Sequence, residues 1–394
     1  MQKNDKIITF LAFGLYFLTG AACFLVGSSL PQLVEMYNKE LDVVVLLGSS
    51  FALGRVVTVN FTGRLVEKKG PKVGLVVGIL MISAYLFGLP TIPNYYAGMV
   101  FAFLGGVGMG AQDAVCPLLL SMSCKNNYAG ALSAGQAFFG IGSFATPFLV
   151  GIMLSAGLPF YYSYYILLIG AVVMLICVPL AKIENQVQGE NVEEQVQPLY
   201  AKNTRLAYAG ILISCAAYCA TINIIGLYTS SFAESIGVSA SNAAFMLTIY
   251  NVGCVMGSFA FIAVLRKVKE QTILILNCIV AFLAIAIALL VNKVTVYFIG
   301  LFVAGFFLGV LFSVIVAIIT RIGYKRISIA SSYAAVAGGM ADILTPIITG
   351  VLVGMLGVGS SFYYVLCTII VTAAAAFVVR GSTSERSYTD GNSE

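Results

Sequence analysis

The sequence of 394 residues contains no histidine and no tryptophan, and only 9% of its residues are charged. Soluble domains carry about 25% charged residues, so this low content excludes a water-soluble fold. Without histidine, carboxylates must carry any proton relay near neutral pH. The nine cysteines form no CxxC pair, and without histidine as a further ligand they predict no zinc or haem site. We therefore expect no metal and no cofactor.

Long apolar runs dominate what is present, and hydrophobic residues make up 60% of the chain. A helix that crosses a bilayer needs about 20 apolar residues. Twelve runs are of about that length, and they predict an all-α membrane protein with twelve transmembrane helices. The runs are Ile7–Ser29, Leu41–Leu65, Val73–Leu89, Tyr95–Met122, Tyr128–Leu154, Phe160–Ala181, Leu206–Ser230, Ser239–Leu265, Thr272–Val291, Val296–Thr320, Ile327–Leu356 and Ser360–Val379.

The basic residues predict the orientation, because cytoplasmic loops are enriched in lysine and arginine. With the N-terminus placed inside, 18 of the 21 lysines and arginines fall on the cytoplasmic side. Lys39 and Lys293 then lie outside, and Arg55 lies within a span. We expect both termini to be cytoplasmic in a multi-pass protein of the plasma membrane. The net charge of +5 is then a topology signal and does not indicate a nucleic-acid partner.

A polar segment rich in Gln, Glu and Asn, residues 182–205, separates six spans from six spans. It predicts a cytoplasmic linker between an N-terminal six-helix bundle (1–181) and a C-terminal one (206–380), with a cytoplasmic tail (381–394). A constant offset of 199 residues relates the two halves. Matched pairs include Gly27 and Gly226, Glu35 and Glu234, Gly54 and Gly253, Gly106 and Gly305, Gly110 and Gly309, Pro147 and Pro346, and Tyr164 and Tyr363.

This repeat predicts two pseudo-symmetric bundles, as in transporters that rock about a central site. The paired glycines permit close helix contacts. The paired Thr-Pro segments, at 146–147 and 345–346, predict a helix break at the same depth in the fifth and eleventh spans.

The turn between the second and third spans reads GRLVEKKGPK, residues 63–72. It resembles the loop motif Gly-x-Leu-x-Asp-Arg-x-Gly-Arg-Lys of the major facilitator superfamily. The resemblance implies the fold of two six-helix bundles and transport of a small-molecule substrate across the lipid bilayer by alternating access, without enzyme activity. We expect a monomer. The matching residues would form a cytoplasmic gate, with Glu67 capping a helix of the other half: Gly63, Glu67, Lys68, Gly70 and Lys72.

Two further comparisons bear on the direction of transport. The fifth span, residues 140–151, lacks the Gly-Pro-x-x-Gly-Gly of family antiporters, which disfavours efflux. The stretch Gln112-Asp-Ala-Val-Cys116-Pro117 is similar to the fourth helix of the fucose–galactose–xylose proton symporters.

The chain also departs from the family pattern in its fourth span. That span has no basic residue, so the arginine usual there in the family is missing.

Three charged residues, Arg55, Asp113 and Asp342, lie deep inside apolar runs. Charge at membrane depth is costly and marks a substrate or proton path. A carboxylate that meets a cation in one state and an apolar wall in another binds and releases a proton in each cycle. We expect Asp113, and then Asp342, to couple transport to protons. Arg55 would pair with either aspartate or hold a substrate carboxylate, because arginine keeps its proton.

Other polar side chains at membrane depth are candidates to hydrogen-bond a substrate, although each alone is more often a bond between two helices. They are Gln112, Gln136, Tyr16, Tyr218, Asn223, Tyr250 and Asn251. The favoured function is proton-coupled symport of a small polar metabolite, such as a sugar or an organic acid. The alternatives are proton-coupled efflux of drugs or metabolites, and organic-anion exchange.

Overall fold

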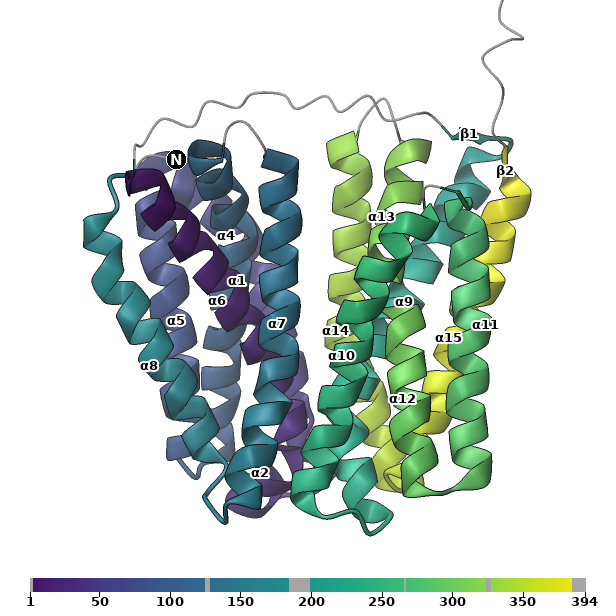
Figure 1. Cartoon of the computed structure of the whole chain (residues 1–394), viewed down its shortest axis with the longest axis horizontal. Coiled ribbons are helices and arrows are strands. Elements are labelled where there is room, and N and C mark those ends of the chain that lie inside the picture. Colours follow the sequence, from purple (N-terminus) through teal and green to yellow (C-terminus); the bar gives the residue numbers. More distant parts are fainter. Residues whose placement is uncertain (1–2, 125–127, 184–198, 266, 324–326, 385–394) are drawn as a thin grey trace, which may run out of the picture. The chain divides into compact units, whose positions relative to one another are not determined.

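Figure 1 shows a computed structural model of the chain, which describes residues 3–124, 128–183, 199–265, 267–323 and 327–384. Twelve helical segments in this described part are long and apolar enough to cross a membrane. The prediction of an all-α membrane protein with twelve spans is confirmed.

The described part of the first half contains eight α-helices, of which α2 lies between the first and second spans. Proline at the start of α2 and α5 costs no hydrogen bond, because the first amides of a helix have no partner inside it. Asn94 caps α6, since its side chain accepts a hydrogen bond from the Ala97 amide at 3.1 Å. The helices are α1 (Lys3–Ser28), α2 (Leu30–Tyr37), α3 (Leu41–Val44), α4 (Leu46–Lys69), α5 (Pro71–Thr91), α6 (Tyr95–Ser123), α7 (Tyr128–Ser155) and α8 (Tyr161–Cys177), which a 3₁₀ turn, η2 (Val178–Leu180), extends.

The second six spans are built from seven helices. They are α9 (Thr204–Ser235), α10 (Ala240–Leu265), α11 (Glu270–Val291), α12 (Val294–Leu308), α13 (Leu311–Ile322), α14 (Ile327–Leu356) and α15 (Gly359–Ser382). A short strand before α9, β1 (Tyr200–Ala201), pairs antiparallel with β2 (Thr383–Ser384) after α15.

The helix bounds repeat with the offset found in the sequence. A shift of 199 residues carries α6, residues 95–123, onto residues 294–322, the first residue of α12 and the last of α13. The same shift carries the first residue of α7, Tyr128, onto that of α14, Ile327.

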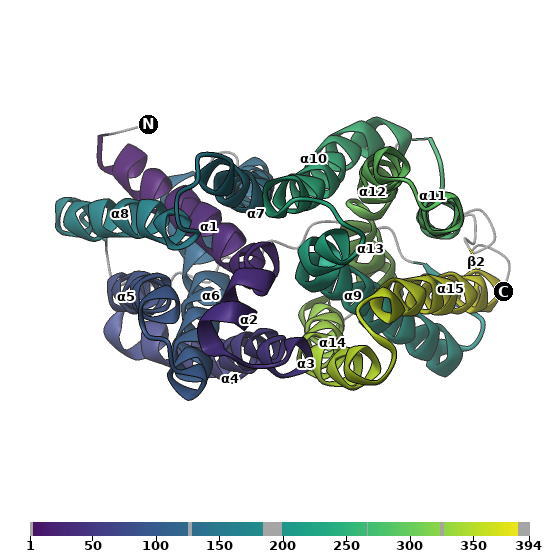
Figure 2. The same ribbon diagram turned by 90° about the horizontal axis from the view of Figure 1, so that it is seen from below.

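One close helix contact also occurs in both repeats. A Cβ atom on Gly54 of α4 would overlap the carbonyl oxygen of Phe103 in α6. A Cβ atom on Gly253 of α10 would overlap that of Phe302 in α12, and 103 and 302 again differ by 199. Figure 2 shows α4, α5 and α6 seen along their length, where they lie side by side. Glycine is needed at these positions because the two backbones touch.

The expected helix breaks at Pro147 and Pro346 are wrong. Both α7 and α14 run through their proline without interruption. Proline removes a single donor, the amide that would bond the carbonyl four residues earlier. In α7 that carbonyl belongs to Ser143, and it accepts a hydrogen bond from the Asn251 side chain of α10 at 3.1 Å instead. A replacement donor thus helps α7 to stay continuous.

The tenth span, expected to be one helix, is divided into α12 and α13. The Tyr218 hydroxyl of α9 donates to the carbonyl of Leu308 at 3.1 Å and is also hydrogen-bonded to the backbone of Phe312. In an intact helix, those two backbone groups bond each other. An inserted side chain is a recognised cause of helix interruption. Tyr218 therefore accounts for the division.

By their contacts, the residues group into two compact units. Unit 1 comprises Met1–Gly189, Ile224–Asn251 and Asp342–Ser361, and unit 2 comprises Glu190–Asn223, Val252–Ala341 and Phe362–Glu394. Three helices, α9, α10 and α14, therefore change unit along their length. The change in α14 falls between Ala341 and Asp342. Leu11, Leu15 and Ile79 are among the fully buried side chains of unit 1.

Candidate functional site

Arg55 of α4 is the centre of the site. Its Nε donates to an oxygen of Asp113 in α6, and the two atoms are 2.8 Å apart. The pair is thus both a hydrogen bond and an ion pair, the stronger kind of polar contact. The residue before Arg55 is Gly54, whose close contact with α6 brings the two helices near enough for this bond.

Asp342 of α14 faces the other side of the same guanidinium. Its carboxylate oxygen lies 3.9 Å from the NH1 nitrogen of Arg55, which is an ion pair but too long for a hydrogen bond. The sequence left open whether Arg55 pairs with Asp113 or with Asp342. The structure places it between both, and all three residues belong to unit 1.

The three side chains do not balance in charge. When all are ionised, one guanidinium faces two carboxylates, and the group carries a net charge of −1. Their exposed fractions are 36% for Arg55, 27% for Asp113 and 26% for Asp342. Part of each side chain is therefore not covered by the protein.

Each aspartate of the site lies four residues before a proline. Pro117 follows Asp113 in α6, and Pro346 follows Asp342 in α14. Because proline has no amide hydrogen, it cannot bond the backbone carbonyl of the aspartate four residues earlier. Both carboxylates thus lie where their helix has lost a backbone bond. The spacing is visible in the sequence, although sequence reasoning did not use it.

Sequence reasoning also missed Cys23 of α1, because the cysteines were considered only as possible metal ligands. The Cys23 thiol lies within electrostatic reach of all three charged groups of the site. Its sulfur contacts that of Met109 in α6 at 3.3 Å. No sequence pattern marks Cys23 out, because its position beside the three charged groups depends on which face of α1 turns toward α6.

Two of the candidate substrate ligands join α1 to its neighbours. The Gln112 side chain is buried and accepts a hydrogen bond from the Thr19 hydroxyl of α1 at 3.0 Å. The ring of Tyr16 is buried against Gly135 of α7. Gln136, the next residue of α7, is exposed.

The remaining candidates lie on α9 and α10. In unit 1, Tyr250 is fully buried, and Asn251 bonds the carbonyl of Ser143. In unit 2, Tyr218 bridges α12 and α13 through its hydroxyl. The buried side-chain oxygen of Asn223 has no hydrogen-bond partner among the described residues. Asn223 therefore keeps an acceptor for a ligand, whereas Tyr218 and Asn251 are already bonded to backbone.

The loop motif lies where α4 ends and α5 begins. Gly70 links the two helices with a φ of 85°, a conformation that glycine adopts without strain. The Lys72 ammonium donates to the carbonyl of Ala181 at 3.4 Å. The side chains of Glu67 and Lys68, and the surroundings of Gly63, lie outside the described part.

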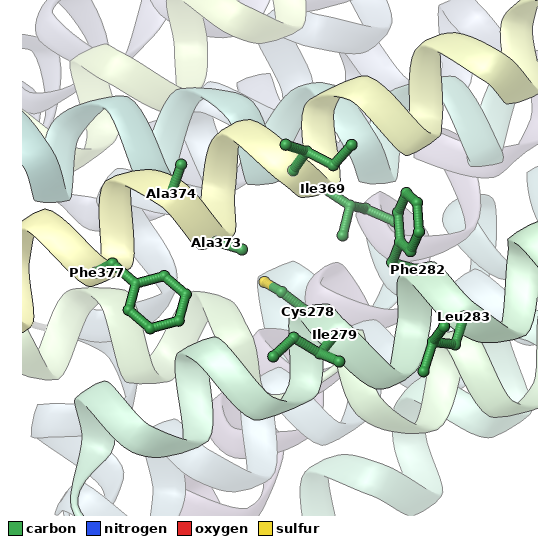
Figure 3. A pocket seen from close by; sticks show the side chains of 9 residues that line it. Cys278, Ile279, Phe282, Leu283, Ile369, Ala373, Ala374 and Phe377 are labelled. Atoms are coloured by element: carbon green, nitrogen blue, oxygen red, sulfur yellow. The ribbon is translucent and has the colours of Figure 1, made fainter.

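A groove of about 310 Å³ lies between α11 and α15 in unit 2. Figure 3 shows Cys278 and Phe282 of α11 facing Ile369 and Phe377 of α15. Its lining exposes only apolar surface. A polar substrate needs a few placed polar groups for orientation, so the site of Arg55 is the better candidate.

Comparisons with known proteins place the chain among membrane transporters. A family model described as Major Facilitator Superfamily matches residues 12–295. The MFS-type transporter YfkL of Bacillus subtilis is 25% identical over 372 residues, covering 92% of this chain and 93% of that protein. The inner membrane transport protein YdiN of Escherichia coli is 25% identical over 346 residues, covering 86% and 81%.

Solved structures share the fold. The xylose transporter XylE from E. coli, in a partially occluded inward-open conformation, superposes with a TM-score of 0.76 at 12% identity, covering 95% of this chain and 98% of that one. A D-xylose-proton symporter superposes with a TM-score of 0.75 at 15% identity, covering 97% and 99%.

Proposed function

The chain belongs to the major facilitator superfamily, and we propose that it imports a small polar metabolite together with protons by alternating access. Members of this family are transporters and not enzymes, so a small-molecule substrate and a lipid bilayer are implied. The proposal adds the coupling ion, the direction and the substrate class.

The unbalanced charge at Arg55 is the observation that carries the proposal. One guanidinium lies 2.8 Å from Asp113 and 3.9 Å from Asp342. Unbalanced charge at membrane depth is costly. A single proton on either carboxylate removes the imbalance and leaves one neutral ion pair. The site is therefore suited to take up one proton and to release it when the surroundings change.

The same charge count favours a neutral substrate, such as a sugar, over an organic acid. A substrate carboxylate at Arg55 would be the third negative group facing one guanidinium. A neutral polar molecule adds no charge, and the exposed Gln136 of the same unit is a candidate to hydrogen-bond it. The two structural neighbours named for xylose are 12–15% identical to this chain and share its fold. Xylose is a neutral sugar, which is the substrate class proposed here.

We further propose that the protein acts as a monomer in the plasma membrane, with both termini in the cytoplasm. Its basic loops then lie on the side that the charge bias predicts. On that side, the motif residues Gly63, Glu67, Lys68, Gly70 and Lys72 would close the cytoplasmic gate.

The test begins with a search for a substrate. Sugars and organic acids are screened for stabilisation of the detergent-purified protein, because a ligand of the folded state raises its stability. The stabilising compound is then offered to proteoliposomes with an alkaline interior. We expect a neutral solute to accumulate and a protonophore to abolish the accumulation. Equilibration without accumulation would overturn the proposal and favour uniport. Proton-driven movement outward would overturn it and favour efflux, and accumulation unaffected by the protonophore would overturn protons as the coupling ion.

A further inference from the structure

We propose that Asp342 carries the coupling proton and that Asp113 remains bound to Arg55 throughout the cycle. The inference rests on the proposed function and deepens it by giving the two aspartates different roles. Sequence reasoning placed Asp113 first, and three features of the structure favour the reverse order.

The first feature is the difference between the two contacts of Arg55. Protonation of Asp113 would remove the charge from a hydrogen bond of 2.8 Å. Asp342 lies 3.9 Å from the guanidinium and has no hydrogen bond to it to lose. Because charge-assisted hydrogen bonds are the stronger contacts, a proton on Asp342 weakens the contacts of Arg55 less than a proton on Asp113 does.

The second feature is how firmly α4 and α6 are joined. A Cβ atom on Gly106 of α6 would overlap the carbonyl oxygen of Phe51 and approach the backbone nitrogen of Arg55 in α4. Gly54 makes the matching contact with Phe103. Backbones in direct contact leave no space for the helices to slide, since packed interiors resist deformation. Arg55 and Asp113 therefore move together.

The third feature is the place of Asp342 in α14. This helix comes from the second repeat, and it changes contact unit immediately before Asp342. Pro346 removes the backbone bond to the Asp342 carbonyl, which makes this turn easier to bend. Pro117 has the same relation to Asp113, so the proline alone does not explain why the two aspartates would have different roles. The difference between them is that the helix of Asp113, α6, packs tightly on α4.

A proton from water on one side converts the Asp342 carboxylate to the acid, and the same proton returns to water on the other side. The titratable groups near Asp342 that the structure describes include Arg55 of α4, Asp113 of α6 and Cys23 of α1. With Asp342 neutral, Arg55 and Asp113 form a balanced pair, and α14 loses its ionic contact with α4. The hydrogen bond of 2.8 Å from the Ser49 hydroxyl of α4 to the Ile343 carbonyl of α14 remains.

Substitution by asparagine does not distinguish the two aspartates, because either change leaves one carboxylate for one guanidinium. Glutamate keeps the charge and alters the vibration of the carboxyl group. The experiment is therefore an infrared pH titration of the detergent-purified full-length protein and of the variants Asp342→Glu and Asp113→Glu. Gel filtration and thermal unfolding show that each variant is folded. Asp42→Glu, on α3, is the control for a carboxylate outside the site.

We expect the native protein to show a carboxylic-acid C=O band that appears as the pH falls. The band should shift in frequency in Asp342→Glu and keep its position in Asp113→Glu and in Asp42→Glu. A shift in Asp113→Glu alone would overturn the assignment while leaving proton coupling at the site intact. The absence of any titrating band that responds to either change would overturn both the assignment and the coupling. No substrate is needed for this measurement.

Discussion

The side-chain amide of Asn251 in α10 donates to the carbonyl oxygen of Ser143 in α7 at 3.1 Å. That carbonyl has lost its usual donor because the residue four positions later is Pro147. Asn251 thus takes the place of the missing backbone amide. Its role is structural, and it joins two helices of unit 1.

We predict that Asn251→Ala destabilises the protein by about 1–3 kcal/mol, the cost of leaving a buried acceptor unpaired. Pro147→Ala should restore most of this loss, because alanine returns the amide donor within α7. Thermal unfolding in detergent, followed with a dye that reacts with cysteines as they become exposed, measures both effects. Asn242→Ala on the exposed side of α10 is the control. Equal stability of Asn251→Ala and the native protein would contradict this role.

A second prediction concerns Tyr218, which the sequence proposed as a substrate ligand. Its hydroxyl occupies the gap between α12 and α13. Tyr218→Phe should lower the free energy of unfolding by about 1–2 kcal/mol and leave the KM of transport unchanged. Tyr363→Phe, at a side chain that is 63% exposed, should change neither quantity. A raised KM with unchanged stability would show instead that the hydroxyl binds substrate.

A third prediction tests the helix contact repeated in both halves. Gly54→Ala and Gly253→Ala each place a methyl group where a backbone carbonyl lies, so both should destabilise the protein, by up to about 3 kcal/mol. Gly170→Ala in α8 is the matched control, because nothing lies within 4 Å of a Cβ atom there. That variant should be as stable as the native protein, or more stable by up to about 1 kcal/mol. This value is the difference in helix propensity between alanine and glycine. Folded yield and thermal unfolding decide between the two outcomes.

A fourth prediction follows from the charge balance at Arg55. Asp113→Asn and Asp342→Asn each leave a neutral pair that no longer needs a proton. Both variants should lose accumulation against a gradient and retain exchange between equal pools of substrate. Glu40→Gln, an exposed carboxylate before α3, should retain both activities. Undiminished proton-driven accumulation in either aspartate variant would remove that residue from the coupling step.

Much of the fold follows from the sequence because membrane helices are marked by length and apolarity alone. The twelve spans and the offset of 199 residues both reappear in the helix bounds, as the starts of α7 at Tyr128 and α14 at Ile327 illustrate. Local exceptions were not predictable. A side chain from α9 divides the tenth span, and a side chain from α10 stabilises α7 at Pro147, so each depends on a neighbour distant in the sequence.

The site was predictable in its residues and not in its geometry. Charges inside apolar runs identified Arg55, Asp113 and Asp342, but which of them meet depends on the face that each helix turns toward its neighbours. Cys23 was missed for the same reason. Conversely, Gln112 and Asn251 are polar and deep in the membrane, yet their bonds to Thr19 and Ser143 indicate that they join helices.

The most direct test of proton coupling is the pH change that accompanies substrate entry. Proteoliposomes with no imposed gradient are suspended in weakly buffered medium, the stabilising solute from the screen is added, and an electrode records the external pH. We predict that the medium becomes alkaline as solute and protons enter together, and that Asp342→Asn abolishes this signal. Solute entry with no pH change, or with acidification of the medium, would contradict it.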